Sequence, residues 1–232
     1  MKAIEVYSTY AQDRFVNSTG QILKESKGGP ASFIVNVLQD LQIPFTIYSP
    51  EKIVVEILLT QNGEFGRIPM APQKSQIKPA KNKILLISTL LNEWELLAGS
   101  SPIYLDVQGY VRNGTDFGKK QKWIVPKPLW GSLICIKGTK EEISCLDQEF
   151  LDEQKAKRQL IITRGALGAD IFIQGRNFFI PAIKTTDLPD TVGAGDTWFA
   201  AYVAKQISGL GAKEAAEFAT EYVARFLQGK NK

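Results

Sequence analysis

The chain has 232 residues, of which 44% are hydrophobic, and a formal net charge of +4. This length suffices for one domain with a substantial core, and the weak, scattered positive charge argues against nucleic-acid binding. The absence of histidine excludes serine–histidine, cysteine–histidine and histidine–metal chemistry. The two cysteines, Cys135 and Cys145, form no paired motif, so we expect neither a disulfide framework nor a zinc site.

Targeting and membrane-spanning segments are not evident in the sequence. The apolar start at residues 1–7 contains Glu5 and is too brief for a signal sequence. Apolar runs elsewhere fall short of the roughly 20 residues that a bilayer requires. We therefore expect a soluble, cytoplasmic protein with no membrane partner.

The predicted elements alternate between strands and helices. Apolar runs predict strands at residues 2–8, 45–48, 52–60, 64–68, 83–88, 103–107, 132–137 and 159–163, and a late hairpin at 169–174 and 177–180. Helical spacing or composition predicts helices at residues 30–41, 92–98, 140–157, 196–207 and 212–227. Residues 69–80, with three prolines, are expected to form a loop. This alternation favours a largely parallel sheet with helices on its faces.

Residues 190–199 (DTVGAGDTWF) carry the most specific chemical signal. Gly193 and Gly195 permit a tight turn whose backbone N–H groups point outward at the start of a helix, which predicts an anion site. Asp196 within that turn is suited to accept a proton from a hydroxyl that attacks a phosphoryl group. The alternative is an ordinary aspartate that caps the helix or complements its dipole.

Several segments, in order, resemble the ribokinase-like PfkB family of carbohydrate kinases. Residues 28–31 (GGPA) resemble the family's first glycine motif, and residues 190–199 resemble its second signature. Residues 137–142 (KGTKEE) are similar to the Asn-x-x-Glu segment near magnesium, and residues 160–169 (LIITRGALGA) to the strand and turn beside the nucleotide. Residues 105–112 (LDVQGYVR) resemble a branch that includes inositol-kinase-like proteins, and they follow a strand where open sheets bind ligands.

The resemblance implies a single α/β domain over residues 1–232. Its fold would be a three-layer α/β/α arrangement, with a mostly parallel central sheet, helices on both faces and a β lid. The lid looks reduced here, with a small hairpin within residues 14–27 and extended segments at 52–68. A partner subunit in a homodimer, or a bulky substrate, could complete the cover over the reacting phosphate.

The resemblance also implies a phosphotransferase that uses ATP and Mg²⁺ and an alcohol group of a small sugar or polyol as acceptor. Asp196 would be the base, and the turn from Gly193 to Gly195 the anion hole. The implied site residues are, for catalysis, Asp196, Gly193, Ala194 and Gly195; for the acceptor, Asp13, Gly28, Gly29, Phe33 and Arg112; for the nucleotide, Thr163, Gly165 and Gly168; and for the metal, through water, Glu142.

Departures from the family pattern leave alternatives open. Phe33 stands where sugar kinases often have a hydroxyl-binding asparagine, and it packs against either an acceptor or the core. Thr139 replaces the asparagine of Asn-x-x-Glu. Arg112 either contacts substrate or pairs with Asp106 to hold a loop. The alternatives to a sugar kinase are a catalytically silent nucleotide or metabolite sensor and a nucleoside kinase.

Overall fold

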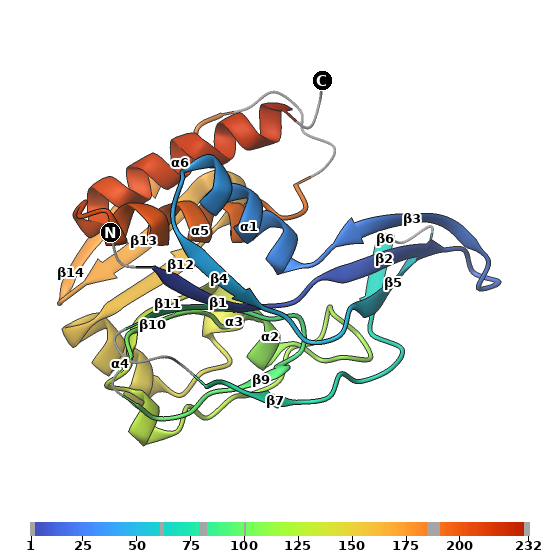
Figure 1. Ribbon diagram of the computed structural model, residues 1–232, viewed down its shortest axis with the longest axis horizontal. Coiled ribbons are helices and arrows are strands. Elements are labelled where there is room, and N and C mark those ends of the chain that lie inside the picture. Colours follow the sequence, from blue (N-terminus) through green and yellow to red (C-terminus); the bar gives the residue numbers. More distant parts are fainter. Residues whose placement is uncertain (1–2, 61–62, 79–82, 100, 185–190, 230–232) are drawn as a thin grey trace.

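The computed structural model describes residues 3–60, 63–78, 83–99, 101–184 and 191–229 (Figure 1). Its strands form an eight-stranded sheet, a four-stranded sheet and a short two-stranded pair. Helices cover both faces of the largest sheet, and the four-stranded sheet projects from one end of it. Among the described helices, none combines the length and apolar character needed to cross a bilayer.

The eight-stranded sheet has the order β14-β13-β12-β11-β10-β8-β1-β4. All pairs from β4 through β12 are parallel, and the β13–β14 hairpin joins antiparallel at one edge. The predicted, mostly parallel central sheet is confirmed. The strands are β1 (Ile4–Ser8), β4 (Phe45–Tyr48), β8 (Ile84–Ser88), β10 (Ile103–Asp106), β11 (Leu133–Thr139), β12 (Gln159–Thr163), β13 (Gly168–Ile173) and β14 (Arg176–Pro181).

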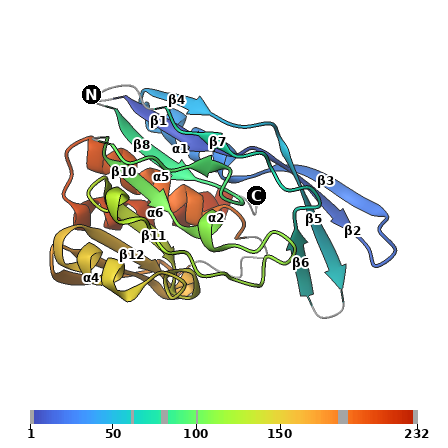
Figure 2. The ribbon, with the colours of Figure 1, turned by 90° about the horizontal axis from the view of Figure 1, so that it is seen from below.

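Helices lie on both faces of this sheet, so the three-layer α/β/α architecture is also confirmed. One face is covered by α1 (Pro30–Asp40), α5 (Ala194–Ile207) and α6 (Ala212–Gly229) (Figure 1). The other carries α2 (Gln108–Val111) and α4 (Gln148–Lys157), labelled in Figure 2. The helix α3 (Lys140–Ile143) and the 3₁₀ turn η1 (Lys127–Leu129) contribute side chains to the same core as α2 and α4. Successive residues of a strand point to opposite faces of the sheet and so pack in two separate cores. Leu86 packs in the first core and Leu85 in the second.

The four-stranded sheet, called the projecting sheet below, has the order β3-β2-β5-β6. It contains β2 (Ala11–Val16), β3 (Ile22–Gly28), β5 (Ile53–Thr60) and β6 (Gly63–Arg67). The hairpin expected within residues 14–27 lies inside the β2–β3 pair, and the extended segments expected at 52–68 lie in and next to β5 and β6. Residues 61–62 of the expected turn lie outside the described residues.

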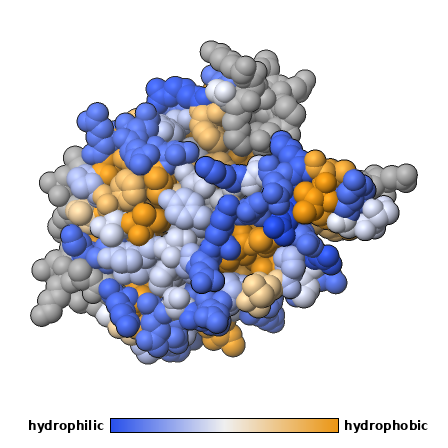
Figure 3. All heavy atoms as spheres, turned by 45° about the vertical axis from the view of Figure 1, so that its right-hand side comes forward, coloured by the Kyte–Doolittle hydropathy of each residue, from blue (hydrophilic) through white to orange (hydrophobic). Residues whose placement is uncertain are grey.

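The two faces of the projecting sheet differ in character. Near the body, Ala11, Ile53 and Val55 pack with Ile68 and Leu90 in a small third core. On the opposite face, the strand register aligns an apolar row across all four strands, formed by Ile22, Val16, Leu58 and Phe65. Figure 3 turns the side of the molecule that carries the projecting sheet toward the viewer and shows apolar patches between hydrophilic side chains there.

Two helix predictions were wrong. Instead of a helix at residues 92–98, the chain forms the short strand β9 (Trp94–Glu95), which pairs with β7 (Ser75–Gln76) inside the expected loop. Asn92 adopts a positive φ of 55°, a conformation that ends a helix. The helix expected at 140–157 is divided into α3 and α4, because Asp147 begins a new helix by accepting a hydrogen bond from the N–H of Phe150 at 2.8 Å.

Candidate active site

The turn at residues 191–195 leads into α5, which begins at Ala194, two residues before the predicted start at Asp196. Gly193 is the residue before the helix and has a φ of 78°, a left-handed conformation that favours glycine. Asp196 lies in the first turn. The N–H of Ala194 donates to the carbonyl of Thr191 at 3.1 Å, so one of the N–H groups predicted to face an anion already has a partner.

The carboxylate of Asp196 reaches the carboxyl end of the central sheet. The hydroxyl of Ser88, the last residue of β8, donates to Oδ1 of Asp196 at 3.0 Å. Burial and the charge of Asp106 raise the pKa of Asp196, whereas Lys137, the Ser88 hydrogen bond and Arg112 lower it; the balance brings the pKa to about 6. A carboxyl group with this pKa is ionised near neutral pH and is still basic enough to receive a proton.

A buried ion pair lies beside Asp196. Lys137 Nζ and Asp106 Oδ2 are 2.7 Å apart, and these two residues are opposite each other in the β10–β11 pair. The other carboxylate oxygen of Asp106 accepts from the N–H of Gln108 at 3.1 Å. Burial alone would lower the pKa of Lys137, but the charges of Asp106 and Asp196 outweigh it and raise that pKa above its ordinary value. Lys137 is therefore a charged ammonium in the interior.

Arg112, which directly follows α2, lies in the same group of charges. Its guanidinium donates to the carbonyl of Leu90 at 3.3 Å and stacks over the ring of Phe117, 4.3 Å from the centroid. Burial lowers its pKa, and four carboxylates oppose that effect: Glu142, Asp196, Asp106 and Glu93. The buried Nε has no hydrogen-bond partner among the described residues. Among the described residues Asp106 pairs with Lys137 and not with Arg112.

The glycine pair before α1 fixes Asp13 at the junction between the projecting sheet and the body. A Cβ on Gly28 would lie 2.1 Å from a carboxylate oxygen of Asp13, and one on Gly29 would lie 2.4 Å from the carbonyl of Thr9. Gly29 also has a φ of 84°. Only glycines therefore allow this close approach. Burial raises the pKa of Asp13.

Phe33 connects α1 to the turn at the start of α5. Its ring lies where a Cβ on Gly193 would fall, within 2.3 Å of the nearest ring atom. The ring also meets Phe226 of α6 edge to face, with centroids 6.1 Å apart. Phe33 therefore packs against the turn and against α6, and its ring forms one wall of the predicted anion turn.

The three predicted nucleotide residues have unequal structural roles. The hydroxyl of Thr163 donates to the carbonyl of Gly138 at 3.4 Å. Gly165, in the 3₁₀ turn η2 (Gly165–Leu167), has a φ of 55° and open space where a Cβ would stand. Gly168 allows β13 to approach β14, because its Cβ would lie 2.1 Å from the carbonyl of Ile180. Gly165 is thus the position of the three with room for a ligand.

Glu142 and Thr139 form a capping box at the start of α3. The Thr139 hydroxyl accepts from the N–H of Glu142 at 3.2 Å, and Glu142 Oε2 accepts from the N–H of Thr139 at 2.8 Å. One oxygen of the predicted metal ligand therefore has a structural partner. Within the described ranges, no three acidic or cysteine side chains gather as a metal centre.

Sequence reasoning missed Ser88 and Lys137. Both lie toward the carboxyl ends of predicted strands, where open α/β sheets place their ligands. The same rule identified Asp106 and Arg112. The signal available for Ser88 and Lys137 was a polar side chain toward the end of an apolar strand. What the sequence did not show was that β8, β10 and β11 are adjacent.

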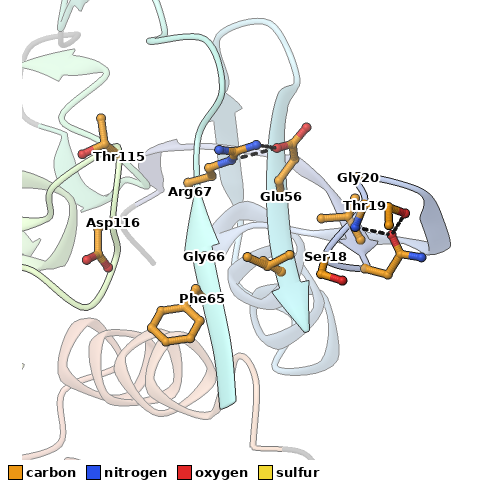
Figure 4. A pocket seen from close by; sticks show the side chains of 12 residues that line it. Ser18, Thr19, Gly20, Glu56, Phe65, Gly66, Arg67, Thr115 and Asp116 are labelled. Carbon is orange, nitrogen blue, oxygen red and sulfur yellow. Dashed lines mark hydrogen bonds and ion pairs between the residues drawn. The ribbon is translucent and has the colours of Figure 1, made fainter. Parts of the chain in front are cut away.

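A hollow of about 550 Å³ lies elsewhere, at the far end of the projecting sheet (Figure 4). Its wall contains the β2–β3 turn at residues 17–20, the Glu56–Arg67 ion pair and the loop residues Thr115 and Asp116. It shares no lining residue with the group around Asp196. The hollow is open, its lining includes Val16, Leu58 and Phe65 of the apolar row, and it does not contain the chemistry described above.

Comparisons with known proteins agree with the fold. No curated protein matches this sequence. The ribokinase of Arabidopsis thaliana, solved with ribose and ATP, has a TM-score of 0.72 at 17% identity, covering 98% of this chain and 93% of its own. A pyrophosphate-dependent kinase of the ribokinase family, solved with a pyrophosphate analogue and myo-inositol, has a TM-score of 0.69 at 14% identity, with 97% and 95% covered.

A nucleoside kinase of Methanocaldococcus jannaschii has a TM-score of 0.68 at 16% identity, covering 98% of this chain and 92% of its own. At these identities the matches establish the fold. Residues 129–229, which include Lys137, Glu142 and Asp196, match the profile of the pfkB family carbohydrate kinases. The chain therefore has the ribokinase fold, and the resemblance to the PfkB family that its motifs predicted is confirmed.

Proposed function

We propose that this protein is an ATP-dependent phosphotransferase that moves the γ-phosphate onto a hydroxyl of a small sugar or polyol. The observation that carries the proposal is Asp196, which Ser88 holds in the first turn of α5 with a pKa raised to about 6. The pfkB match over residues 129–229 and the kinases that share the fold support the same reaction class.

Asp196 acts as the general base in the proposed reaction. The acceptor oxygen attacks the γ-phosphorus while the bond to the bridging β–γ oxygen breaks, and ADP leaves. The hydroxyl proton passes to Asp196, whose Oδ1 is already held by Ser88. The turn from Gly193 to Gly195 holds the transferred group through backbone N–H groups and the positive end of the helix dipole.

The acceptor and donor lie on opposite sides of this turn. On the acceptor side are Asp13 at the glycine pair of residues 28–29, Phe33 against the turn, and Arg112 with its unpaired Nε. The nucleotide side is formed by Thr163, by Gly165 in the exposed 3₁₀ turn, and by Gly168. Phe33 lies against Gly193 and Lys137 lies beside Gly195, in the turn that precedes Asp196.

Magnesium enters as the complex with ATP. Mg²⁺ usually keeps several waters and binds few protein carboxylates in addition to substrate phosphates. Glu142 would fit this limited role through a metal-bound water, because its Oε2 caps α3 and only one carboxylate oxygen remains. When bound, the metal neutralises charge on the β- and γ-phosphates.

Two alternatives differ in acceptor or in chemistry. The fold of the M. jannaschii nucleoside kinase supports a nucleoside as acceptor. A silent sensor is favoured by the Phe33 ring against Gly193 and by the engaged N–H of Ala194, which narrow the anion turn. The retained Asp196 favours an enzyme, because binding alone does not require a base.

The test is phosphate transfer from magnesium-ATP to a panel of sugars, inositols and nucleosides, with pyrophosphate as a second donor. Pyrophosphate is included because one structure with this fold is of a pyrophosphate-dependent kinase. A phosphorylated sugar or polyol made with ATP supports the proposal. A product formed only from nucleosides would make the protein a nucleoside kinase, and a product formed only with pyrophosphate would make pyrophosphate the donor. ATP binding without any product points to the sensor.

A further inference from the structure

Lys137 has an unexpected place for a lysine. Its Nζ lies 3.0 Å from where a Cβ on Gly195 would stand, beside the first turn of α5. A helix N-terminus carries a partial positive charge, so an ammonium there is unfavourable, and burial adds a desolvation cost. Lys137 is nevertheless only 4% exposed. The ammonium of Lys137 thus adds positive charge to a helix end that already carries a partial positive charge.

The ion pair with Asp106 explains how the charge is tolerated, but not why it is there. An uncharged pair of similar size between β10 and β11 would avoid desolvation, and such replacements are often neutral or stabilising. An ammonium has three donors, and the bond to Asp106 uses one of them. Since Gly195 is exposed and has no side chain, the remaining donors lie directly beside the turn.

A second cation supports the same interpretation. Arg112 lies near enough to Asp196 to lower its pKa, as Lys137 does, and its buried Nε lacks a partner among the described residues. Two cations and a helix N-terminus beside one base are groups that attract a phosphoryl anion. Asp106 and Asp196 offset the two cationic charges.

We propose that Lys137 binds the transferred phosphoryl group at the turn formed by residues 193–195. The inference rests on the proposed phosphotransfer function and adds a binding residue to it. As the bond to the leaving group breaks, charge spreads over the equatorial phosphoryl oxygens, and a fixed ammonium stabilises it without reorganisation. Gly195 leaves room for the ammonium, because a Cβ at this position would lie 3.0 Å from Nζ, which is tighter than an ordinary contact.

The test separates the anion role of Lys137 from its pairing with Asp106. Lys137→Met removes the charge but leaves a buried, unpaired carboxylate, which destabilises the fold. The double variant Lys137→Met/Asp106→Asn removes both charges and keeps an oxygen for the N–H of Gln108. Lys140→Met is the matched control, because Lys140 is an exposed lysine three residues along the same segment.

Each protein is titrated calorimetrically with inorganic phosphate and with magnesium-ATP, and its urea unfolding and turnover are measured. Phosphate affinity should fall roughly ten- to a hundred-fold in Lys137→Met and remain low in the double variant, although unfolding stability returns. Turnover should fall about a hundred-fold or more in both, and Lys140→Met should match the wild type.

The proposal is overturned if the double variant regains phosphate affinity together with stability, since Lys137 would then serve only its ion pair. It is also overturned if the wild type binds phosphate no more tightly than Lys137→Met. Should the wild type phosphorylate no acceptor, the proposed function fails, and the phosphate titrations still decide the role of Lys137. The double variant provides the comparison if the single variant does not fold.

Discussion

The ring of Phe33 fills the space that a side chain at Gly193 would need, with its nearest atom 2.3 Å from the position of that missing Cβ. Two features therefore require glycine at position 193: the contact with the Phe33 ring and the φ of 78°. Gly193→Ala should cost about 2 kcal/mol or more in unfolding free energy, from the left-handed conformation and the clash together. Urea unfolding measures the loss.

A double-mutant cycle separates these two causes. In Phe33→Ala the ring is gone, so Gly193→Ala should then cost only the conformational part, about 1–2 kcal/mol. An equal cost of Gly193→Ala in both backgrounds would show that the ring does not press on the turn.

Ser88 and Asp196 provide a prediction about pH. Because the Ser88 hydroxyl stabilises the ionised carboxylate, Ser88→Ala should raise the pKa of Asp196 above about 6. The acid limb of the kcat/KM profile should then move to higher pH, since the base must be ionised to accept a proton. Ser208→Ala, at the opposite end of α5, is the control and should leave the limb in place. An unchanged limb in Ser88→Ala would mean that another group sets it.

The raised pKa of Asp196 also affects stability. Its pKa of about 6 in the folded chain exceeds the ordinary value of 3.8, so the folded state holds this proton more tightly than the unfolded state does. Asp196 therefore destabilises the fold above about pH 6, and this penalty disappears as the pH falls toward about 4. Asp196→Asn should be more stable than the wild type at about pH 8, with a gain that shrinks on acidification. Urea unfolding of both proteins across this range would show a constant difference if the pKa were not raised.

The capping box at α3 supplies a prediction on stability. Thr139→Ala removes the side chain that accepts from the N–H of Glu142 and should cost about 1 kcal/mol of unfolding free energy. Thr139→Ser keeps the hydroxyl and should cost less. Chemical denaturation of the two variants compares them directly, and equal losses would mean that the methyl group, not the cap, matters.

The sequence was sufficient for much of the fold because long apolar strands and the Gly193–Gly195 turn carry local signals. The helix expected at 92–98 failed for a non-local reason. Glu93 there is fully buried and accepts from the hydroxyl of Thr9 at 2.9 Å, far along the chain, and from two backbone N–H groups nearby. Helical composition cannot reveal such a contact.

The candidate site divides in the same way. Asp196 and its glycines lie on one continuous segment, so their spacing identified them. Ser88 and Lys137 belong to separate strands, and they approach Asp196 only because the sheet order places β8, β10 and β11 side by side. The cap that Glu142 forms at α3 could have been predicted from the Thr-x-x-Glu spacing, but the sequence led only to the prediction of a metal ligand there.

The most direct test of the proposed function compares turnover and ATP affinity in the wild type and Asp196→Asn. The asparagine keeps an oxygen for the Ser88 hydroxyl but cannot take up the proton. We expect kcat to fall about 10²–10⁴-fold, with the Kd for magnesium-ATP little changed. Equal kcat in the two proteins would contradict the role of Asp196 as the base.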